Sequence, residues 1–291
     1  VTAAAEDIPA VQELYAENPS SPTAPSATGT NAVAIGSQSE AAGSESFAAG
    51  FNATATAYRA LALGHGANAG NTSVALGTSA NASGAEGNAL GRGATASGGE
   101  SAAFGHSSVS IGTRSTALTR SYASGTDSFA AAIGNNTSTY GATAAESVAI
   151  GKQAKATNTG SLAFGHTTTS TGQYALSLGY QSTAAGTQSV AIGRANQTSG
   201  NFALALGYNS TASATNSVAI GDSNTASHAN AITIGDSVQS TATNQVNLGG
   251  TADTVRISES YTLPTADGTT GQVLTTDGSG AVTFATAGGG S

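Results

Sequence analysis

Side chains that can bind ligands or transfer protons recur at one place in this sequence, directly after a glycine. His65, His106 and His166 each follow a glycine. Imidazole can act as an acid, a base or a metal ligand, and aromatic and arginine side chains often anchor binding surfaces. The residues in this position with the bulkiest side chains are Phe51, His65, Arg92, His106, Lys152, His166, Tyr180, Arg194 and Tyr208. We predict that these nine residues form a ridge along an elongated molecule.

Two interpretations of this ridge are open. If it faces outward, it is the best candidate surface for binding a glycan or a protein. Alternatively, its side chains shield the backbone or fill a seam between chains, which we favour. A threefold axis would also bring equivalent histidines together and could hold an ion. Within one chain the histidines are far apart, so the sequence predicts no metal site.

Catalytic chemistry finds no support in the arrangement of the reactive residues. Carboxylates such as Glu86, Glu100 and Glu146 lie near turns, where they keep the chain soluble. No Ser-His-Asp set can be singled out among so many serines. The glycine-rich strings do not open a helix, which a phosphate-binding loop requires. We therefore predict no enzyme activity, no catalytic residues and no cofactor.

A short block of apolar, small and apolar residues ending in glycine repeats along the chain, as in Val148-Ala149-Ile150-Gly151. From Gly151 to Gly249 this glycine stands at every fourteenth position without exception. We call these the closing glycines and predict them at Gly36, Gly50, Gly64, Gly77, Gly91, Gly105, Gly134, Gly151, Gly165, Gly179, Gly193, Gly207, Gly221, Gly235 and Gly249. This register predicts a solenoid in which each repeat is one coil.

A second glycine often lies halfway between two closing glycines, as at Gly43, Gly98 and Gly141. Each 14-residue unit therefore reads as two strands of four to five residues joined by two tight turns, which leaves no room for a helix. Residues with period-two alternation share one face of a strand. The sequence thus predicts an all-β fold, a flat two-stranded parallel β-solenoid with coils about 4.8 Å apart.

The composition limits the interior and the partners of such a solenoid. Charged residues make up 8% of the 291 residues, and Trp, Met and Cys are absent. Only small side chains fit inside a thin coil, so a stripe of Val, Ile and Leu is left on one face. Burial against copies of the same chain would cover that stripe, and three copies form an economical closed assembly. The net charge of −8 argues against nucleic acid, and no apolar run is long enough to insert in a membrane.

These repeats resemble a known family. The block Asn-Ser-Val-Ala-Ile-Gly at 216–221 is similar to the head repeat of YadA-like trimeric autotransporter adhesins, and the resemblance covers residues 31–250. It implies a left-handed parallel β-roll, a homotrimer and a role in attachment outside the cell. Those implications come from the resemblance and not from the periodicity.

A second resemblance concerns the segment after the repeats. Residues 261–280 contain Leu-Pro-Thr-Ala-Asp-Gly and Gly-Gln-Val-Leu-Thr-Thr-Asp-Gly. This segment is similar to a linker of tail-fibre and appendage proteins of marine bacteriophages. Together the two resemblances favour a trimeric phage fibre that contributes to host attachment, located on the virion surface. The alternatives are the head of a bacterial surface adhesin and a surface filament without a receptor.

Three regions are expected along the chain. Residues 1–30 form an attachment segment, with a helix at 7–18 and a proline-rich connector, which either docks onto another virion or cell-surface protein or serves as a lead-in. Residues 31–250 form the repeats, and residues 251–291 form a small β adaptor. Within the repeats, an irregular zone at 107–133 has Val109-Ser110-Ile111-Gly112 half a period early. We expect a bulge or an extra loop there, either a tolerated insertion or a receptor contact.

Overall fold

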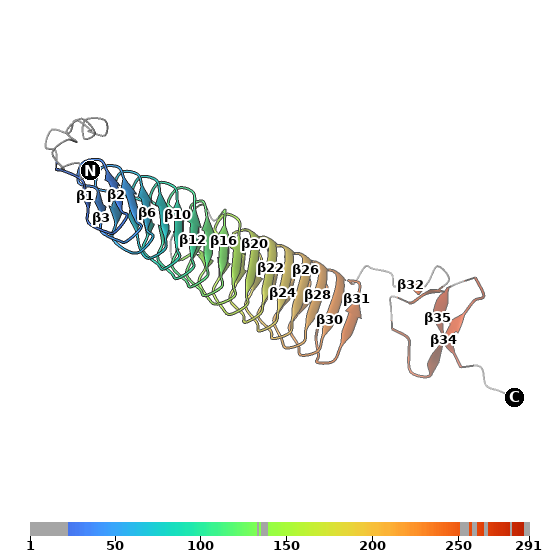
Figure 1. Ribbon diagram of the computed structural model, residues 1–291. Coiled ribbons are helices and arrows are strands. Elements are labelled where there is room, and N and C mark those ends of the chain that lie inside the picture. Colours follow the sequence, from blue (N-terminus) through green and yellow to red (C-terminus); the bar gives the residue numbers. More distant parts are fainter. Residues whose placement is uncertain are drawn as a thin grey trace, which may run out of the picture. The chain divides into compact units, whose positions relative to one another are not determined.

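The structure, a computed structural model, describes residues 23–132, 134, 139–250, 256–257, 261–264, 267–279 and 281–287. Its contacts divide the chain into two units, residues 1–181 and 182–291, which are described in turn. Within each unit short parallel strands stack coil upon coil (Figure 1). The expected all-β parallel solenoid is therefore confirmed. The helix predicted at 7–18 lies outside the described residues, and the described part of the chain has no helix of the length and apolarity that a bilayer crossing requires.

The first unit has two parallel sheets, and each coil contributes one strand to each sheet. One sheet has two-residue strands in the order β1 (Ser26–Ala27), β3 (Glu40–Ala41), β5 (Thr54–Ala55), β7 (Asn68–Ala69), β9 (Asn81–Ala82), β11 (Thr95–Ala96), β13 (Val109–Ser110), β15 (Tyr122–Ala123), β17 (Gly141–Ala142), β19 (Lys155–Ala156) and β21 (Thr169–Ser170). The other sheet has the order β2 (Val33–Ile35), β4 (Phe47–Ala49), β6 (Leu61–Leu63), β8 (Val74–Leu76), β10 (Asn88–Leu90), β12 (Ala102–Phe104), β14 (Thr116–Leu118), β16 (Phe129–Ala131), β18 (Val148–Ile150), β20 (Leu162–His166) and β22 (Leu176–Tyr180). We call these the narrow sheet and the wide sheet.

Strand register follows the sequence repeat. Phe47 pairs with Leu61 at the equivalent position of the next coil, and Leu61 pairs in the same way with Val74. The second step is one position shorter than the first, as the spacing of Gly50, Gly64 and Gly77 requires. Most strands are shorter than the predicted four to five residues, because the two turns take up more of each coil. The closing glycine, the residue after it and a left-handed residue all belong to one turn, as at Gly64, His65 and Gly66.

The interior is filled by alanine and serine. The central residue of the wide-sheet strands is fully buried, as at Ala48, Ala62 and Ala75. The largest fully buried side chains are only Asn and Thr, as at Asn196, so a coil has no room for a buried leucine. The apolar residues that flank each central residue point outward, and Leu63 remains 42% exposed. The predicted small-residue interior and exposed apolar stripe are both present.

The second unit continues the same pattern and adds two hairpins. Its narrow sheet has β23 (Thr183–Ala184), β25 (Gln197–Thr198), β27 (Thr211–Ala212) and β29 (Thr225–Ala226), and its wide sheet has β24 (Val190–Arg194), β26 (Leu204–Tyr208), β28 (Val218–Asp222), β30 (Ile232–Asp236) and β31 (Val246–Leu248). The hairpins are antiparallel and consist of β32 (Arg256–Ile257) with β33 (Tyr261–Thr262), and β34 (Gln272–Thr276) with β35 (Val282–Thr286). Strands were expected in these segments, and the structure confirms them.

The turn between β34 and β35 is held by Asp277. Its Oδ1 accepts hydrogen bonds from the backbone amides of Ser279 (2.8 Å) and Ala281 (3.2 Å), and its Oδ2 accepts one from the Ser279 hydroxyl (2.6 Å). These bonds favour the charged carboxylate and lower the pKa of Asp277. The Asp-Gly turn signal therefore acts through a carboxylate that caps the turn.

Buried asparagines hold the turns of the second unit. The Asn224 amide donates to the carbonyl oxygens of Ile220 (2.6 Å) and Gly235 (2.7 Å), and its Oδ1 accepts a bond from the Val238 amide (2.7 Å). Asn196, two repeats earlier, makes the same three contacts with Ile192, Gly207 and Ser210. In these coils the strand extends to five residues and includes the closing glycine. A polar side chain three positions after that glycine thus links two coils.

Replacing Asn224 by alanine is expected to lower the free energy of unfolding by about 3 kcal/mol, because it removes three hydrogen bonds inside the coil. Urea unfolding followed by circular dichroism measures the loss. Ser213→Ala, an exposed change in the same unit, serves as the control and should stay within about 0.5 kcal/mol of the parent. Equal stability of the two variants would show that the buried bonds contribute nothing net.

The irregular zone predicted at 107–133 begins too early and ends before the insertion does. Val109–Ser110 is β13, an ordinary narrow-sheet strand that pairs with Thr95–Ala96, so it is not half a period early. The coils continue without a break, because Thr119 and Ala132 stand where closing glycines are expected and adopt φ of 37° and 54°. The loss of two glycines, and not the loss of strands, disturbs the sequence pattern.

The real insertion lies between β16 and β17. Phe129 pairs with Val148, so this coil is five positions longer than a regular repeat, and the extra positions fall within 132–140. Gly134 is therefore not a closing glycine, contrary to the prediction. Ala131 pairs with Ile150, so the residue in register with Gly151 is Ala132. Gly141 was predicted to be a mid-coil turn, and it lies instead in β17, paired with Lys155.

Candidate functional site

The predicted ridge occupies the turn that follows each wide-sheet strand. In the coil of β6, Gly64 has φ 137°, His65 stands at the apex and Gly66 has φ 61°. The Ala67 amide donates to the Gly64 carbonyl (3.2 Å) and closes the turn. Side chains after the closing glycine are therefore carried on one edge of the stacked coils. In the first unit this edge holds the ridge residues from Phe51 to Tyr180, and in the second unit it holds Arg194 and Tyr208.

Ridge residues of successive coils touch one another. The rings of Phe51 and His65 stack with centroids 5.2 Å apart and planes at 19°. The rings of His166 and Tyr180 stack at 5.2 Å and 7°. Parallel coils hold equivalent residues one strand spacing apart, which places such rings in van der Waals contact.

Cations take part in the same contacts. The Arg92 guanidinium is hydrogen-bonded to Nε2 of His106 in the next coil. In the second unit the Arg194 guanidinium lies 5.3 Å from the centroid of the Tyr208 ring, a cation–π distance. The ridge is thus a contiguous polar and aromatic edge. Its role in binding stays a prediction.

A second edge, which the sequence analysis missed, lies at the opposite turn of each coil. Its residues adopt left-handed φ values of 53° to 59°, as Arg59 and Glu45 show. We call it the counter-ridge. In the first unit its members other than glycine are Asn31, Glu45, Arg59, Thr72, Glu86, Glu100, Arg114, Asp127, Glu146 and Tyr174, and in the second unit they are Gln188, Phe202, Asn216, Asn230 and Asn244. Many of them stand two positions after a mid-coil glycine, as Glu86 and Glu100 do after Gly84 and Gly98, and this spacing was the signal that could have revealed the edge.

Counter-ridge residues also pair from coil to coil. Arg59 Nε lies 2.7 Å from Glu45 Oε2, and Arg114 binds both carboxylate oxygens of Asp127 at 2.6 and 2.7 Å. In the second unit the Asn216 amide nitrogen donates to Oδ1 of Asn230 (3.0 Å), and the amide nitrogen of Asn230 donates to Oδ1 of Asn244 (2.8 Å). Both arginines of the counter-ridge are therefore already neutralised within the chain.

The hydrogen bonds from Arg114 lower the pKa of Asp127. A lowered folded-state pKa adds stability above the unfolded pKa, and that stability is lost as the pH falls through the folded value. Arg114→Gln is expected to raise the pKa of Asp127, measured by NMR titration of its carboxyl carbon. Arg59→Gln, the matched change on another ion pair, should leave this titration unchanged. An unshifted Asp127 in Arg114→Gln would contradict the ion pair.

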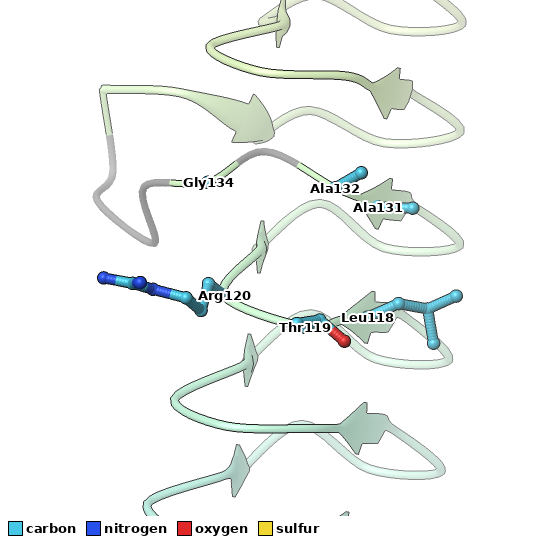
Figure 2. A pocket seen from close by; sticks show the side chains of 6 residues that line it. All are labelled: Leu118, Thr119, Arg120, Ala131, Ala132 and Gly134. Carbon is cyan, nitrogen blue, oxygen red and sulfur yellow. The ribbon is translucent and has the colours of Figure 1, made fainter.

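A hollow of about 390 Å³ lies beside the ridge where the insertion leaves the coil. It is lined by Leu118, Thr119, Arg120, Ala131, Ala132 and Gly134 (Figure 2). Figure 2 shows Arg120 extending to one side of the chain and Leu118 to the other. Arg120 is the only ionisable group among these six residues, so their side chains offer no acid–base pair. In the described part of the chain no three His, Asp or Glu side chains gather as a metal-ligand set.

Comparison with known families agrees with this architecture. The YadA head domain repeat (2 copies) matches at residues 27–53, 41–67, 69–94, 89–115, 142–167, 170–196, 186–210, 199–224 and 212–237, more than half of the chain. The chain belongs to the YadA head-repeat family. The curated proteins contain no match to it.

The YadA head matches stop at residue 115 and resume at residue 142. This gap coincides with the two coils that close on Thr119 and Ala132 and with the insertion. Membership makes the chain a structural protein of the adhesin type, exposed at a surface or outside the cell. Its solenoid is a structural fold and is not typically enzymatic.

Proposed function

We propose that the chain is one subunit of a homotrimeric fibre shaft that buries its apolar stripe between copies. The supporting observation is the difference between the outer faces of the two sheets. Outward residues of the wide sheet are apolar and exposed, with Leu63 at 42%, Leu76 at 40% and Leu178 at 42%. Most outward residues of the narrow sheet are polar, such as Glu40 and Lys155, and Val109 and Tyr122 are the large apolar or aromatic exceptions in its described strands. Only the wide sheet has an exposed apolar face that burial against a partner would stabilise.

The size of the stripe favours a tight assembly. Equivalent residues of successive coils lie about 4.8 Å apart, so the stripe is continuous along each unit. Soluble monomers rarely expose a contiguous apolar patch above a few hundred Å². Burial stabilises by about 25 cal/mol per Å², and a closed ring of three copies would remove every stripe from water at once.

We infer that the shaft serves attachment and belongs to a phage virion. The family match supports an adhesive role, and strand β34 lies in the segment that resembles phage appendage linkers. Three chains would present the same outer residues several times, so weak contacts with a host glycan or protein add up to avidity. The terminal segments would join other virion proteins.

The second candidate function is the head of a bacterial surface adhesin, which the YadA family match favours by itself. Immunogold electron microscopy with antibodies against residues 31–250 separates the two. Gold on free virus particles, at fibres that project from the virion, is expected. Gold confined to cell envelopes, with unlabelled particles, would overturn the virion assignment and support the bacterial adhesin.

A further inference from the structure

The two edges of the first unit carry opposite charge. The described ridge positions from residue 37 to residue 180 contain no acid, and they hold Arg92, Lys152 and three histidines. On the counter-ridge, Arg59 and Arg114 are bound to acids of their own chain. Among the described residues, three other carboxylates of that edge form no ion pair, those of Glu86, Glu100 and Glu146. A basic edge thus faces away from an acidic edge.

These opposite charges cannot meet within one chain. Glu86 and Arg92 are separated by strand β10, because their turns lie at opposite ends of it. Six residues of extended chain span about 20 Å. Both side chains are exposed, as are Glu100 and Lys152. The ridge cations and these counter-ridge carboxylates can therefore pair with each other only between two molecules.

We propose that the basic ridge of one copy lies along the acidic counter-ridge of the next copy around the trimer axis. This inference rests on the proposed trimer and adds the seam that joins its subunits. Each interface is then heterologous, with the ridge of one subunit against the counter-ridge of the next, and the ring closes after three. Opposite charges across such a seam fix its register and exclude wrong partners.

The register follows from symmetry. Rotation about an axis parallel to the stack keeps every residue at its own height. A ridge residue stands half a coil above the counter-ridge residue that precedes it and half a coil below the next one. Arg92 would therefore lie between Glu86 and Glu100 of the partner subunit, and Lys152 would lie beside Glu146 of the partner subunit. Both of these first-unit cations thus meet a carboxylate.

At other heights of the seam, aromatic side chains of the ridge would meet aromatic side chains of the counter-ridge. Tyr174 precedes Tyr180 by half a coil in the first unit, and Phe202 precedes Tyr208 by half a coil in the second, so each pair would be adjacent across the seam. All four aromatic side chains are exposed on the single chain. Tyr180 and Tyr208 also contact a ridge residue of the preceding coil, His166 and Arg194 respectively. Paired rings are favourable contacts across an interface.

Cysteine cross-linking tests the seam, because the chain has no cysteine of its own. The variant combines Arg92→Cys with Glu100→Cys and is treated with a short bismaleimide after its solution mass has been measured. We expect covalent dimers and trimers on a denaturing gel. The control combines Arg92→Cys with Glu146→Cys, which lie several coils apart and should give at most a tenth of the trimer band.

Charge reversal gives an independent readout. Arg92→Glu places like charges across the seam and is expected to raise the concentration at which half of the trimer dissociates by about tenfold. Adding Glu86→Arg and Glu100→Arg to the same chain should restore the parent value. A parent protein of trimeric mass that shows neither the cross-link nor the rescue would overturn the seam and leave the ridge for an anionic ligand. A parent of monomeric mass would instead overturn the proposed function.

Discussion

Gly64→Ala is expected to lower the free energy of unfolding by about 2 to 6 kcal/mol, the sum of two effects. Gly64 has φ 137°, which costs an alanine about 1 to 3 kcal/mol of strain. A Cβ there would also lie 2.6 Å from the carbonyl oxygen of Gly77 in the next coil, so the stacked backbones must move apart. Such overpacking adds about 1 to 3 kcal/mol. Thermal and urea unfolding at fixed protein concentration measure the change.

The control lies two positions away in the same turn. Gly66 has φ 61°, and a Cβ there meets only the Ser79 hydroxyl oxygen at 3.9 Å. Asn52 and Asn209 occupy the equivalent place in other coils at φ 53° and 50°. Gly66→Asn should therefore stay within about 1 kcal/mol of the parent. If both variants lost the same stability, close backbone stacking would not be the reason for the closing glycine.

Leu63→Asp is expected to dissociate the assembly while each chain keeps its fold. The Leu63 side chain is 42% exposed on the single chain, so an aspartate there can stay hydrated in a monomer. In the trimer, the change removes about 2 kcal/mol of apolar burial from every chain and buries three carboxylates. Sedimentation velocity should show a shift to a monomer with an unchanged circular dichroism spectrum.

Thr95→Asp is the matched control, because Thr95 points outward from a strand of the narrow sheet. The proposed trimer leaves that face in water, so the variant should sediment like the parent. The account of the stripe would fail if Leu63→Asp kept the parent's sedimentation coefficient. It would also fail if Thr95→Asp dissociated the assembly equally well.

The repeat itself was predictable from the sequence, because two requirements recur in every coil. A small residue must stand at the centre of each wide-sheet strand, as at Ala62, and a glycine must stand where backbones stack, as at Gly64. The C-terminal hairpin was also predictable from Asp277-Gly278 between alternating strands. Period and turn chemistry were sufficient for the fold.

The irregular coils were not predictable from glycine spacing. Thr119 and Ala132 take positive φ without glycine, since neighbouring coils determine the backbone there and outweigh a cost of about 1 to 2 kcal/mol. Gly134 lies two positions after Ala132, and it was therefore mistaken for the closing glycine of that coil. A glycine pattern identifies only the positions that glycine occupies. It does not identify a turn in which another residue adopts a positive φ.

The counter-ridge was missed for a related reason. Its members share a conformation and not a residue type, since Glu86, Arg114 and Tyr174 adopt left-handed φ values of 58°, 54° and 55°. The conformation brings them to one edge, and only the coil geometry reveals that charges on this edge oppose those on the ridge. The ridge was visible in the sequence because a closing glycine precedes each member.

The most direct test of the account is the mass of the purified chain in solution, measured by light scattering at high concentration and after dilution. A trimeric shaft with the stripe inside the assembly has a persistent mass near three times 27.8 kDa, which is the expected result. A folded monomer of 27.8 kDa would contradict it, because the exposed apolar face of the wide sheet would then be stable in water without a partner.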